Sequence, residues 1–211
     1  MAKIDAFEKY AGAYEEWFEA NEWAYKSELE AIRRLMPITG KGMEVGIGTG
    51  RFAIPLGIRV GVEPSGKMAG IARSKGLEVV DGICENLPFD DETFDRVLLV
   101  TTICFVDDPA RCVAEVRRVL SPGGCIVIGF IDKNSQLRKL YEAKKDKSKF
   151  YGDATFYSVD EILGFLREAG FGAFKTCQTI FRPLPEIDSL EPVEDGHGEG
   201  AFVAVMARKP R

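Results

Sequence analysis

The stretch MEVGIGTGRF (43–52) combines a short apolar strand with three closely spaced glycines. Residues 43–47 are predicted to form a strand that runs directly into Gly46, Gly48 and Gly50, with a short helix after them. Glycines at a strand-to-helix turn let the backbone approach a ligand closely and leave amide groups pointing toward it. The stretch therefore indicates a ligand-binding turn in an α/β protein.

The spacing of these glycines differs from the dinucleotide-binding pattern G-x-G-x-x-G. The third glycine comes one position early, and Arg51 stands where that pattern has a glycine. Glu44 precedes the first glycine by two residues, and a carboxylate there suits a ligand with an ammonium group better than a pyrophosphate. No GxxxxGK[ST] motif is present, which excludes P-loop chemistry.

A second acid, Glu63, ends the next predicted strand, nineteen residues after Glu44. An acid at this place can accept two hydrogen bonds from the vicinal hydroxyls of a ribose. Together with the glycines, the two acids favour a binding site over an isolated tight turn.

From Gly40 onward, short apolar strands alternate with helices. Strands are expected at 43–47, 57–63, 77–82, 94–102 and 123–131, with helices at 65–76 and 109–120. This alternation predicts a parallel sheet covered on both faces. A helix is expected at 158–171, with Ser158 as its cap and Glu161 completing a capping box. Two more strands, 171–181 and 200–209, follow the start of this helix. Because no helix separates these two strands, they should pair antiparallel.

The first 36 residues have a helical pattern, with Asn21 expected to cap a second helix that Pro37 ends. Aromatic residues recur at three- and four-residue spacings: Phe7, Tyr10, Tyr14, Trp17 and Phe18. This stripe either covers a bound cofactor, with Tyr14 as a binding residue, or packs as core against the sheet. We expect an N-terminal helical cap or lid at 1–38 and a binding domain at 39–211.

Composition narrows the class of protein. The 211 residues include 28 basic and 33 acidic side chains, a net charge of −5 that disfavours nucleic acid as a partner. No apolar run approaches the roughly 18 residues of a membrane span, and no secretory signal is evident, so we expect a cytoplasmic protein without membrane contact. Gln and Asn are scarce, a composition typical of heat-tolerant proteins.

The five cysteines are Cys84, Cys104, Cys112, Cys125 and Cys177. Their number is odd, and no CxxC motif or Cys/His cluster is present. We therefore expect no structural zinc, no metal and no disulfide framework, but reduced thiols in apolar surroundings.

Six segments occur in the order of a known family: EVGIGTG, VEPSGKM, GICENLPF, FDRVLLVTTICFVDDP, VLSPGG and FYSVDEILGFLREAGF. The chain resembles the class I S-adenosylmethionine-dependent methyltransferases, in particular the methyltransferase type 11 family, closely over 40–131 and more loosely over 151–171. The resemblance implies a Rossmann-like, doubly wound α/β fold. Its seven-stranded, mostly parallel sheet has the order 3-2-1-4-5-7-6, with the last strand antiparallel. S-adenosyl-L-methionine is the implied cofactor.

The resemblance also implies roles for the turn residues. Gly46, Gly48 and Gly50 are similar to the loop under the methionine part of the cofactor. Glu44 resembles the acid behind its amino group, and Glu63 resembles the acid that binds the ribose.

Further implied contacts lie toward the adenine. Pro64 and Met68 resemble residues that line it, and Ile83, Cys84 and Glu85 resemble the turn at its edge. The family often has an acid at the position of Ile83, so backbone atoms near Cys84 or the Glu85 side chain must bind the adenine amino group.

At the end of the fourth strand, Thr101 resembles the residue whose carbonyl meets the ammonium group of the cofactor. The family often has His at the position of Phe105. The single histidine, His197, is either a general base or a surface residue. Asp107, Asp108 and Pro109 are expected to form the N-terminal cap of the helix at 109–120, and no residue is assigned as catalytic.

The function that we expect is in-line methyl transfer from S-adenosylmethionine to an unidentified small-molecule acceptor. That acceptor could be an amine, oxygen, carbon, thiol or arsenical. One alternative is a regulatory protein that binds S-adenosylmethionine without catalysis. Another is an RNA methyltransferase that uses the basic residues of 138–149. The oligomeric state is left open.

Overall fold

The computed structural model describes residues 4–135 and 150–211. Five helices are described: α1 (Asp5–Ala20), α2 (Glu22–Leu35), α3 (Gly66–Ser74), α4 (Pro109–Val119) and α6 (Val159–Glu168). Eight strands are described: β1 (Gly42–Val45), β2 (Val60–Val62), β3 (Glu78–Val80), β4 (Phe94–Val100), β5 (Leu120–Ile131), β6 (Gly172–Thr179), β7 (Glu194–Asp195) and β8 (Phe202–Arg208). Short 3-10 helices are η1 (Ile54–Leu56), η2 (Ile103–Phe105), η4 (Tyr151–Asp153) and η5 (Leu184–Glu186).

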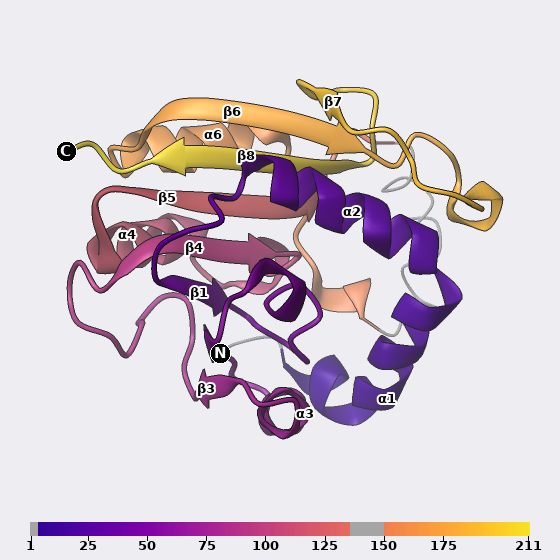
Figure 1. Ribbon diagram of the computed structural model, residues 1–211, viewed down its shortest axis with the longest axis horizontal. Coiled ribbons are helices and arrows are strands. Elements are labelled where there is room, and N and C mark those ends of the chain that lie inside the picture. The colour runs from indigo at the N-terminus through magenta and orange to yellow at the C-terminus, as the bar shows by residue number, and fades with distance from the viewer. Residues whose placement is uncertain (1–3, 136–149) are drawn as a thin grey trace.

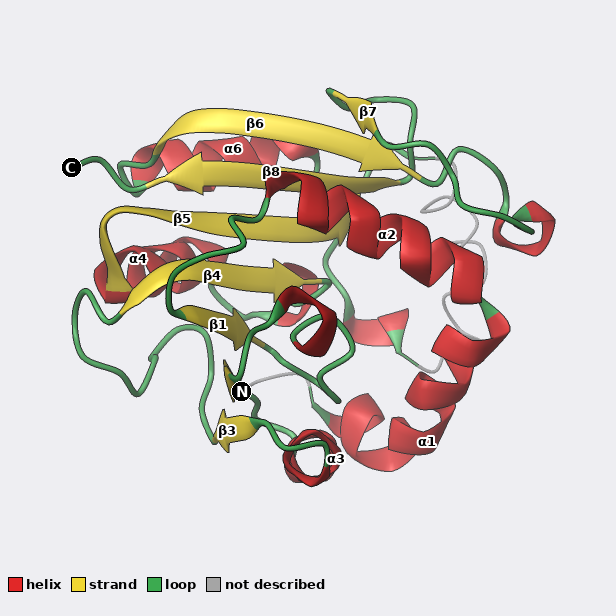
Figure 2. Ribbon diagram, viewed as in Figure 1, coloured by secondary structure: helices red, strands yellow, loops and turns green. Residues whose placement is uncertain are grey.

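The strands form one sheet with the order β3-β2-β1-β4-β5-β8-β6-β7 (Figures 1 and 2). Strands β1 to β5 pair parallel, and β8 pairs antiparallel with both β5 and β6. The predicted Rossmann-like order is confirmed. The predicted number of seven strands was wrong by one, because the two-residue strand β7 pairs with Cys177 and Gln178 at the sheet edge. A strand of two residues is too short to leave an alternating pattern in the sequence.

Apolar side chains cover both faces of the sheet. Along β4, Val97 and Leu99 point to one face, where they join the core formed with α4 and α6. Leu98 and Val100 point to the other face, where they join the core formed with α2 and α3. Strands covered on both faces are continuously apolar, as the sequence predicted for a parallel sheet. Figure 1 shows α2 crossing the sheet over β5 and β8.

Helix α2 is part of this covering layer. Its buried residues include Leu29 and Ile32, which belong to the same core as β4, β5 and β8. Helix α1 continues from it toward α3 at the other end of the sheet (Figure 2). Its backbone departs from helical geometry at Tyr10, where two helical pieces meet.

Three expected helix caps can be compared with the structure. Asp108 and Ser158 accept hydrogen bonds from backbone N–H groups of α4 and α6, and Ser158 forms a complete capping box with Glu161. Asn21 occupies the cap position of α2, but its side chain makes no cap hydrogen bond there. Its amide group instead donates 2.9 Å to the Trp17 carbonyl at the end of α1.

Candidate functional site

A cavity of about 150 Å³ lies at the carboxyl ends of β1, β2, β4 and β5. It is lined by Ile4, Phe7, Tyr14, Trp17, Phe18, Glu28, Val45, Gly46, Gly48, Phe52, Val62, Glu63, Pro64, Met68, Gly82, Ile83, Cys84, Glu85, Val100, Thr101, Thr102, Phe105, Val106, Ile131, Phe150 and Leu184. In the sheet order, β1 and β4 are the neighbours at which the direction of winding reverses. Ligands of open α/β sheets bind at this kind of position.

Of the predicted site residues, all except Glu44 and Gly50 line the cavity. Gly50 has φ +82°, and a Cβ atom there would collide with the side chain of Leu77. Gly48 has φ +55° and faces the cavity, where a Cβ atom would lie 3.4 Å from the Tyr14 hydroxyl. The two glycines therefore have different roles, because Gly48 leaves room in the cavity while Gly50 allows the turn to pack against the chain before β3.

Glu63 holds the glycine turn from the end of β2. One carboxylate oxygen accepts a hydrogen bond of 2.8 Å from the Gly48 N–H, and the other accepts 2.9 Å from the Ser65 N–H. Burial raises the pKa of Glu63, and these two hydrogen bonds oppose the rise. The carboxylate keeps lone pairs beyond those used by the two N–H groups.

Glu44 lies next to the turn, with 2% of its surface exposed. Its Oε2 atom has no hydrogen-bond partner within the described residues. Burial raises the pKa of Glu44 well above its usual value, and the nearby charge of Glu63 raises it further. A buried acceptor without a partner is rare in proteins, which fits a group that completes its hydrogen bonding with a ligand or water.

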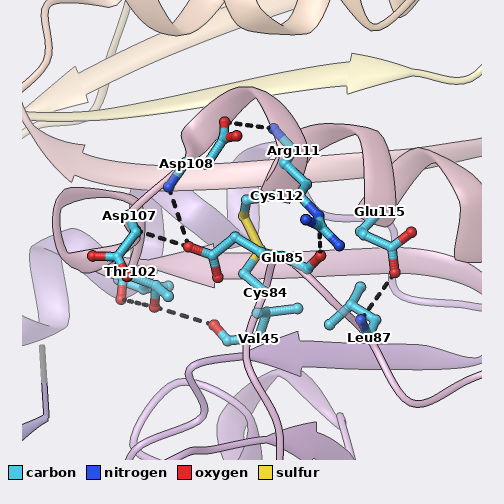
Figure 3. Close-up of a disulfide and its surroundings, with 11 residues drawn as sticks. Val45, Cys84, Glu85, Leu87, Thr102, Asp107, Asp108, Arg111, Cys112 and Glu115 are labelled. Atoms are coloured by element: carbon cyan, nitrogen blue, oxygen red, sulfur yellow. Dashed lines mark hydrogen bonds between the residues drawn. A yellow bond between two sulfur atoms is a disulfide. The ribbon is translucent and has the colours of Figure 1, made fainter. Parts of the chain in front are cut away.

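The turn at 83–85 is fastened to α4 (Figure 3). A disulfide joins Cys84 to Cys112, so the expectation of reduced thiols was wrong for this pair. The partners are 28 residues apart in sequence, and the fold brings them together where spacing alone could not indicate it. Cys104, Cys125 and Cys177 are buried thiols outside this disulfide, as expected.

Hydrogen bonds strengthen the same connection. Glu85 Oε1 accepts from the backbone N–H groups of Asp107 (2.8 Å) and Asp108 (3.2 Å), as Figure 3 shows. Arg111 Nε donates 2.8 Å to the Glu85 carbonyl. One carboxylate oxygen of Glu85 is thus already occupied, while Ile83, 38% exposed, lies at the rim of the cavity.

Thr101 ends β4 with a positive φ of 49°, a conformation that costs energy for a residue with a Cβ atom. Its N–H donates 2.8 Å to the Gly129 carbonyl, and its carbonyl accepts 3.1 Å from Cys104 Sγ. Backbone strain at the end of a central strand, beside a cavity, is typical of functional sites.

Aromatic side chains of α1 form the opposite wall. Tyr14 is partly buried, and its pKa is raised by burial and by the carboxylates of Glu44 and Glu63. The ring of Phe7 packs edge-on against Phe105, with centroids 5.0 Å apart. Tyr14 lines the cavity and also packs against the core, so the stripe combines features of both interpretations that its spacing allowed.

Sequence reasoning missed Glu28. This residue of α2 lines the cavity with 8% of its surface exposed, and burial raises its pKa to about 8. The helical spacing could have indicated its burial, because Glu28 lies four residues before the core residue Ile32 on the same helix face.

Other sequence candidates lie elsewhere. His197 is exposed and is not among the lining residues. The basic segment 138–149 lies outside the described residues. Over 4–135 and 150–211, no group of three or more His, Cys, Asp or Glu side chains could hold a metal ion. In the same ranges, no helix is long and apolar enough to cross a bilayer.

Comparisons with known proteins match the part of the chain that contains this site. A family model described as a methyltransferase domain matches residues 43–128, which contain the glycine turn, Glu63 and the 83–85 turn. Protein MJ1123 of Methanocaldococcus jannaschii is 48% identical over 98% of this chain and all of its own length. Protein Rv2003c of Mycobacterium tuberculosis is 36% identical over 98% of this chain and 75% of its own length.

A solved structure from Thermotoga maritima, described as a "SAM-dependent methyltransferase, possible histamine N-methyltransferase", superimposes with a TM-score of 0.94. It is 49% identical in sequence, and the match covers 97% of this chain and 98% of that one. Fold and similarity together place the chain in the class I S-adenosylmethionine-dependent methyltransferases. Within that class, the chain belongs to the methyltransferase type 11 family.

Proposed function

We propose that this protein transfers a methyl group from S-adenosyl-L-methionine to a small-molecule acceptor. The observation that carries the proposal is the position of Glu63, whose carboxylate holds the Gly48 N–H while facing the cavity. A carboxylate at the end of the second strand suits a ribose, and the glycine turn beside it suits the rest of the cofactor.

The residues present fit the cofactor. Gly48 leaves space that a Cβ atom would fill, and Glu44, behind the turn, has an unpaired buried oxygen suited to an ammonium group through water. Pro64, Met68 and the 83–85 turn offer an apolar surface for the adenine. When bound, S-adenosylmethionine supplies an electrophilic methyl group on a positively charged sulfur.

The chain itself contributes orientation and exclusion of water. Phe7, Tyr14 and Phe105 enclose the cavity with aromatic rings, and rings favour contact with a cationic group. A transfer that neutralises a sulfonium is favoured in a water-poor site that holds the reacting atoms in line. In this proposal residues 1–38 act as a cap over the site, and 39–211 bind the cofactor.

An enzyme fits the cavity better than a regulatory binding protein does. Beyond the residues assigned to the cofactor, the lining continues through Trp17, Ile131, Phe150 and Leu184, which leaves a place for a second molecule. A regulatory protein has no need of that space. The RNA-methylating alternative depends on residues 138–149 and gains no support from the described residues.

We assign the protein to the cytoplasm in this proposal, although it contains a disulfide. Cytosolic disulfides are rare in general but common in proteins of hyperthermophiles. The low content of Gln and Asn is in keeping with such a source.

The proposal is tested by incubating the protein with S-adenosylmethionine and a panel of amines, phenols, thiols and carbon acids. Release of S-adenosylhomocysteine that depends on an acceptor supports it. Tight cofactor binding with no transfer to any acceptor class would favour the regulatory alternative.

A further inference from the structure

Glu28 is a buried carboxyl group in the cavity wall that the proposed cofactor site does not use. Within the described residues its side chain has no hydrogen bond or ion pair, and burial alone accounts for its raised pKa. Burying a carboxyl group without a partner is costly, so the fold keeps it there at a loss of stability. A ligand that pairs with Glu28 would compensate for this cost.

Glu28 lies on α2, a helix that contributes no residue to the proposed cofactor site. Helix α2, which carries it, packs against β5, β6 and β8. Glu63 follows β2, and the sheet order puts β1 and β4 between β2 and β5. The helix that carries Glu28 thus packs on the strands that lead to Ile131, at the end of β5, and Leu184, beyond β6, and both of these residues line the cavity. The proposed function leaves both of them to the acceptor.

The charge of the cavity indicates the chemical class of that acceptor. Of the three carboxyl groups that line the cavity, Glu63 and Glu85 belong to the proposed cofactor site, which leaves Glu28 for the acceptor. The described lining of the cavity includes no Lys, Arg or His side chain. The remaining wall near Glu28 is apolar or aromatic, with Trp17 and Phe18 from α1. An acidic cavity with aromatic walls favours a ligand that is basic at one point and apolar elsewhere.

We propose that Glu28 binds the amino group of an arylalkylamine acceptor. This inference rests on the proposed methyl transfer and names its substrate class. The ammonium group of the acceptor donates a hydrogen bond to the carboxylate of Glu28. Transfer of one N–H proton then leaves a neutral amine and a protonated Glu28. The nitrogen electron pair is thereby free to accept the methyl group, and Glu28 is the group positioned to take the proton.

Proton release upon binding gives a test that does not depend on turnover. With a pKa of about 8, Glu28 is mostly protonated at pH 7 in the free protein, while the amine in solution is an ammonium ion. The complex holds one proton fewer than its separate components, whether the pair is carboxylate with ammonium or carboxyl with amine. Binding should thus release about one proton at pH 7.

Calorimetry measures this release when it is repeated in two buffers of different ionisation enthalpy. The protein is first saturated with S-adenosylhomocysteine and then titrated with phenethylamine, tryptamine or the neutral isostere 2-phenylethanol. We expect at least one amine to bind with proton release, and 2-phenylethanol to bind at least about tenfold more weakly.

Two variants complete the test. Glu28→Gln should weaken amine binding at least about tenfold and abolish proton release, while affinity for S-adenosylhomocysteine stays within about twofold. Glu22→Gln, an exposed position on the same helix, should behave as the unmodified protein.

Three results overturn the inference. In the first, neither amine binds. In the second, Glu28→Gln leaves amine binding unchanged. In the third, Glu28→Gln loses affinity for S-adenosylhomocysteine about tenfold. The last result would move Glu28 to the cofactor half of the cavity. If S-adenosylhomocysteine does not bind at all, the proposed function fails instead, and titration of the free protein with the amines still decides the role of Glu28.

Discussion

The Glu63 carboxylate and the Gly48 N–H are joined by a hydrogen bond of 2.8 Å, which links the end of β2 to the turn after β1. The acid expected to bind a ribose thus also fixes the loop expected to lie under the methionine part of the cofactor. Any change at Glu63 should act on both halves of the cofactor site.

Replacement of Glu63 by Gln should weaken S-adenosylhomocysteine binding at least about tenfold. The amide loses charge-assisted hydrogen bonds, each worth roughly 1.5–3 kcal/mol. Calorimetry measures the change, with Glu78→Gln at an exposed position of β3 as the control. Equal affinity in the variant and the unmodified protein would remove Glu63 from the site.

The shift in Tm on adding a ligand distinguishes S-adenosylhomocysteine from NAD as the molecule that binds. S-adenosylhomocysteine at 100 times its Kd should stabilise the protein by about 2.7 kcal/mol and raise its Tm. NAD at the same concentration should leave the Tm unchanged, because the third glycine comes too early for the dinucleotide pattern. A shift with NAD alone would instead indicate an oxidoreductase.

The buried acid Glu28 should make stability depend on pH. Its pKa is about 8 in the folded protein and near 4.5 when exposed, so the unfolded chain loses this proton first as pH rises. Stability from this group is complete below pH 4.5 and declines by about 1.4 kcal/mol per pH unit up to pH 8. Glu63 and Glu44 have raised pKa values and act in the same direction.

Urea unfolding between pH 4.5 and 8, without ligands, measures this decline. In Glu28→Gln the free energy of unfolding should decline less steeply with pH, because the contribution of Glu28, about 1.4 kcal/mol per pH unit, is absent. Parallel curves for the variant and the unmodified protein would mean that Glu28 titrates normally in the folded state.

Reduction of the Cys84–Cys112 disulfide should lower the free energy of unfolding by about 2–4 kcal/mol, the usual range for a cross-link. Peptide mapping without reductant should first recover the two cysteines in one linked fragment. The double variant Cys84→Ala/Cys112→Ala should then be insensitive to reductant. A protein that melts identically with and without reductant contradicts the prediction.

Helix α1 should close over the cofactor. Two carboxylates of α1 contact the residues around the site. Glu8 accepts a hydrogen bond of 2.8 Å from Ser65 Oγ, and Glu15 forms ion pairs with Arg51 and Lys75. Partly exposed ion pairs such as those of Glu15 contribute only about 0–1 kcal/mol each, so they oppose the opening of α1 only weakly.

Hydrogen exchange tests this closure. Residues 5–20 should exchange more slowly with S-adenosylhomocysteine than without it, and Glu15→Gln should raise exchange in the free protein. Equal protection in both states would make the aromatic stripe plain core and remove Tyr14 from the site.

Much of the fold could be predicted because its signals are local. The glycine turn, the apolar strands and the caps at Asp108 and Ser158 each depend on neighbouring residues, and the structure confirms them. The cavity also unites most of the predicted residues, since parallel strands bring their carboxyl ends to one edge.

What the sequence could not indicate depends on tertiary contact. The pairing of Cys84 with Cys112 requires that the 83–85 turn lie against α4, and no spacing rule encodes that contact. The burial of Glu28 depends on the packing of α2 against β5 and β8, which the helix sequence alone does not indicate. Strand β7 forms only because the loop between β6 and β8 passes along β6.

The bond between Cys84 and Cys112 also has a thermodynamic consequence for the cell. Cys84 lines the cavity, so oxidation acts on the turn at which we propose that the cofactor binds. Linkage is reciprocal: if the oxidised turn binds the cofactor more tightly, bound cofactor lowers the reduction potential of the disulfide by the equivalent free energy. The concentration of S-adenosylmethionine and the thiol redox state of the cell would then both affect the state of Cys84.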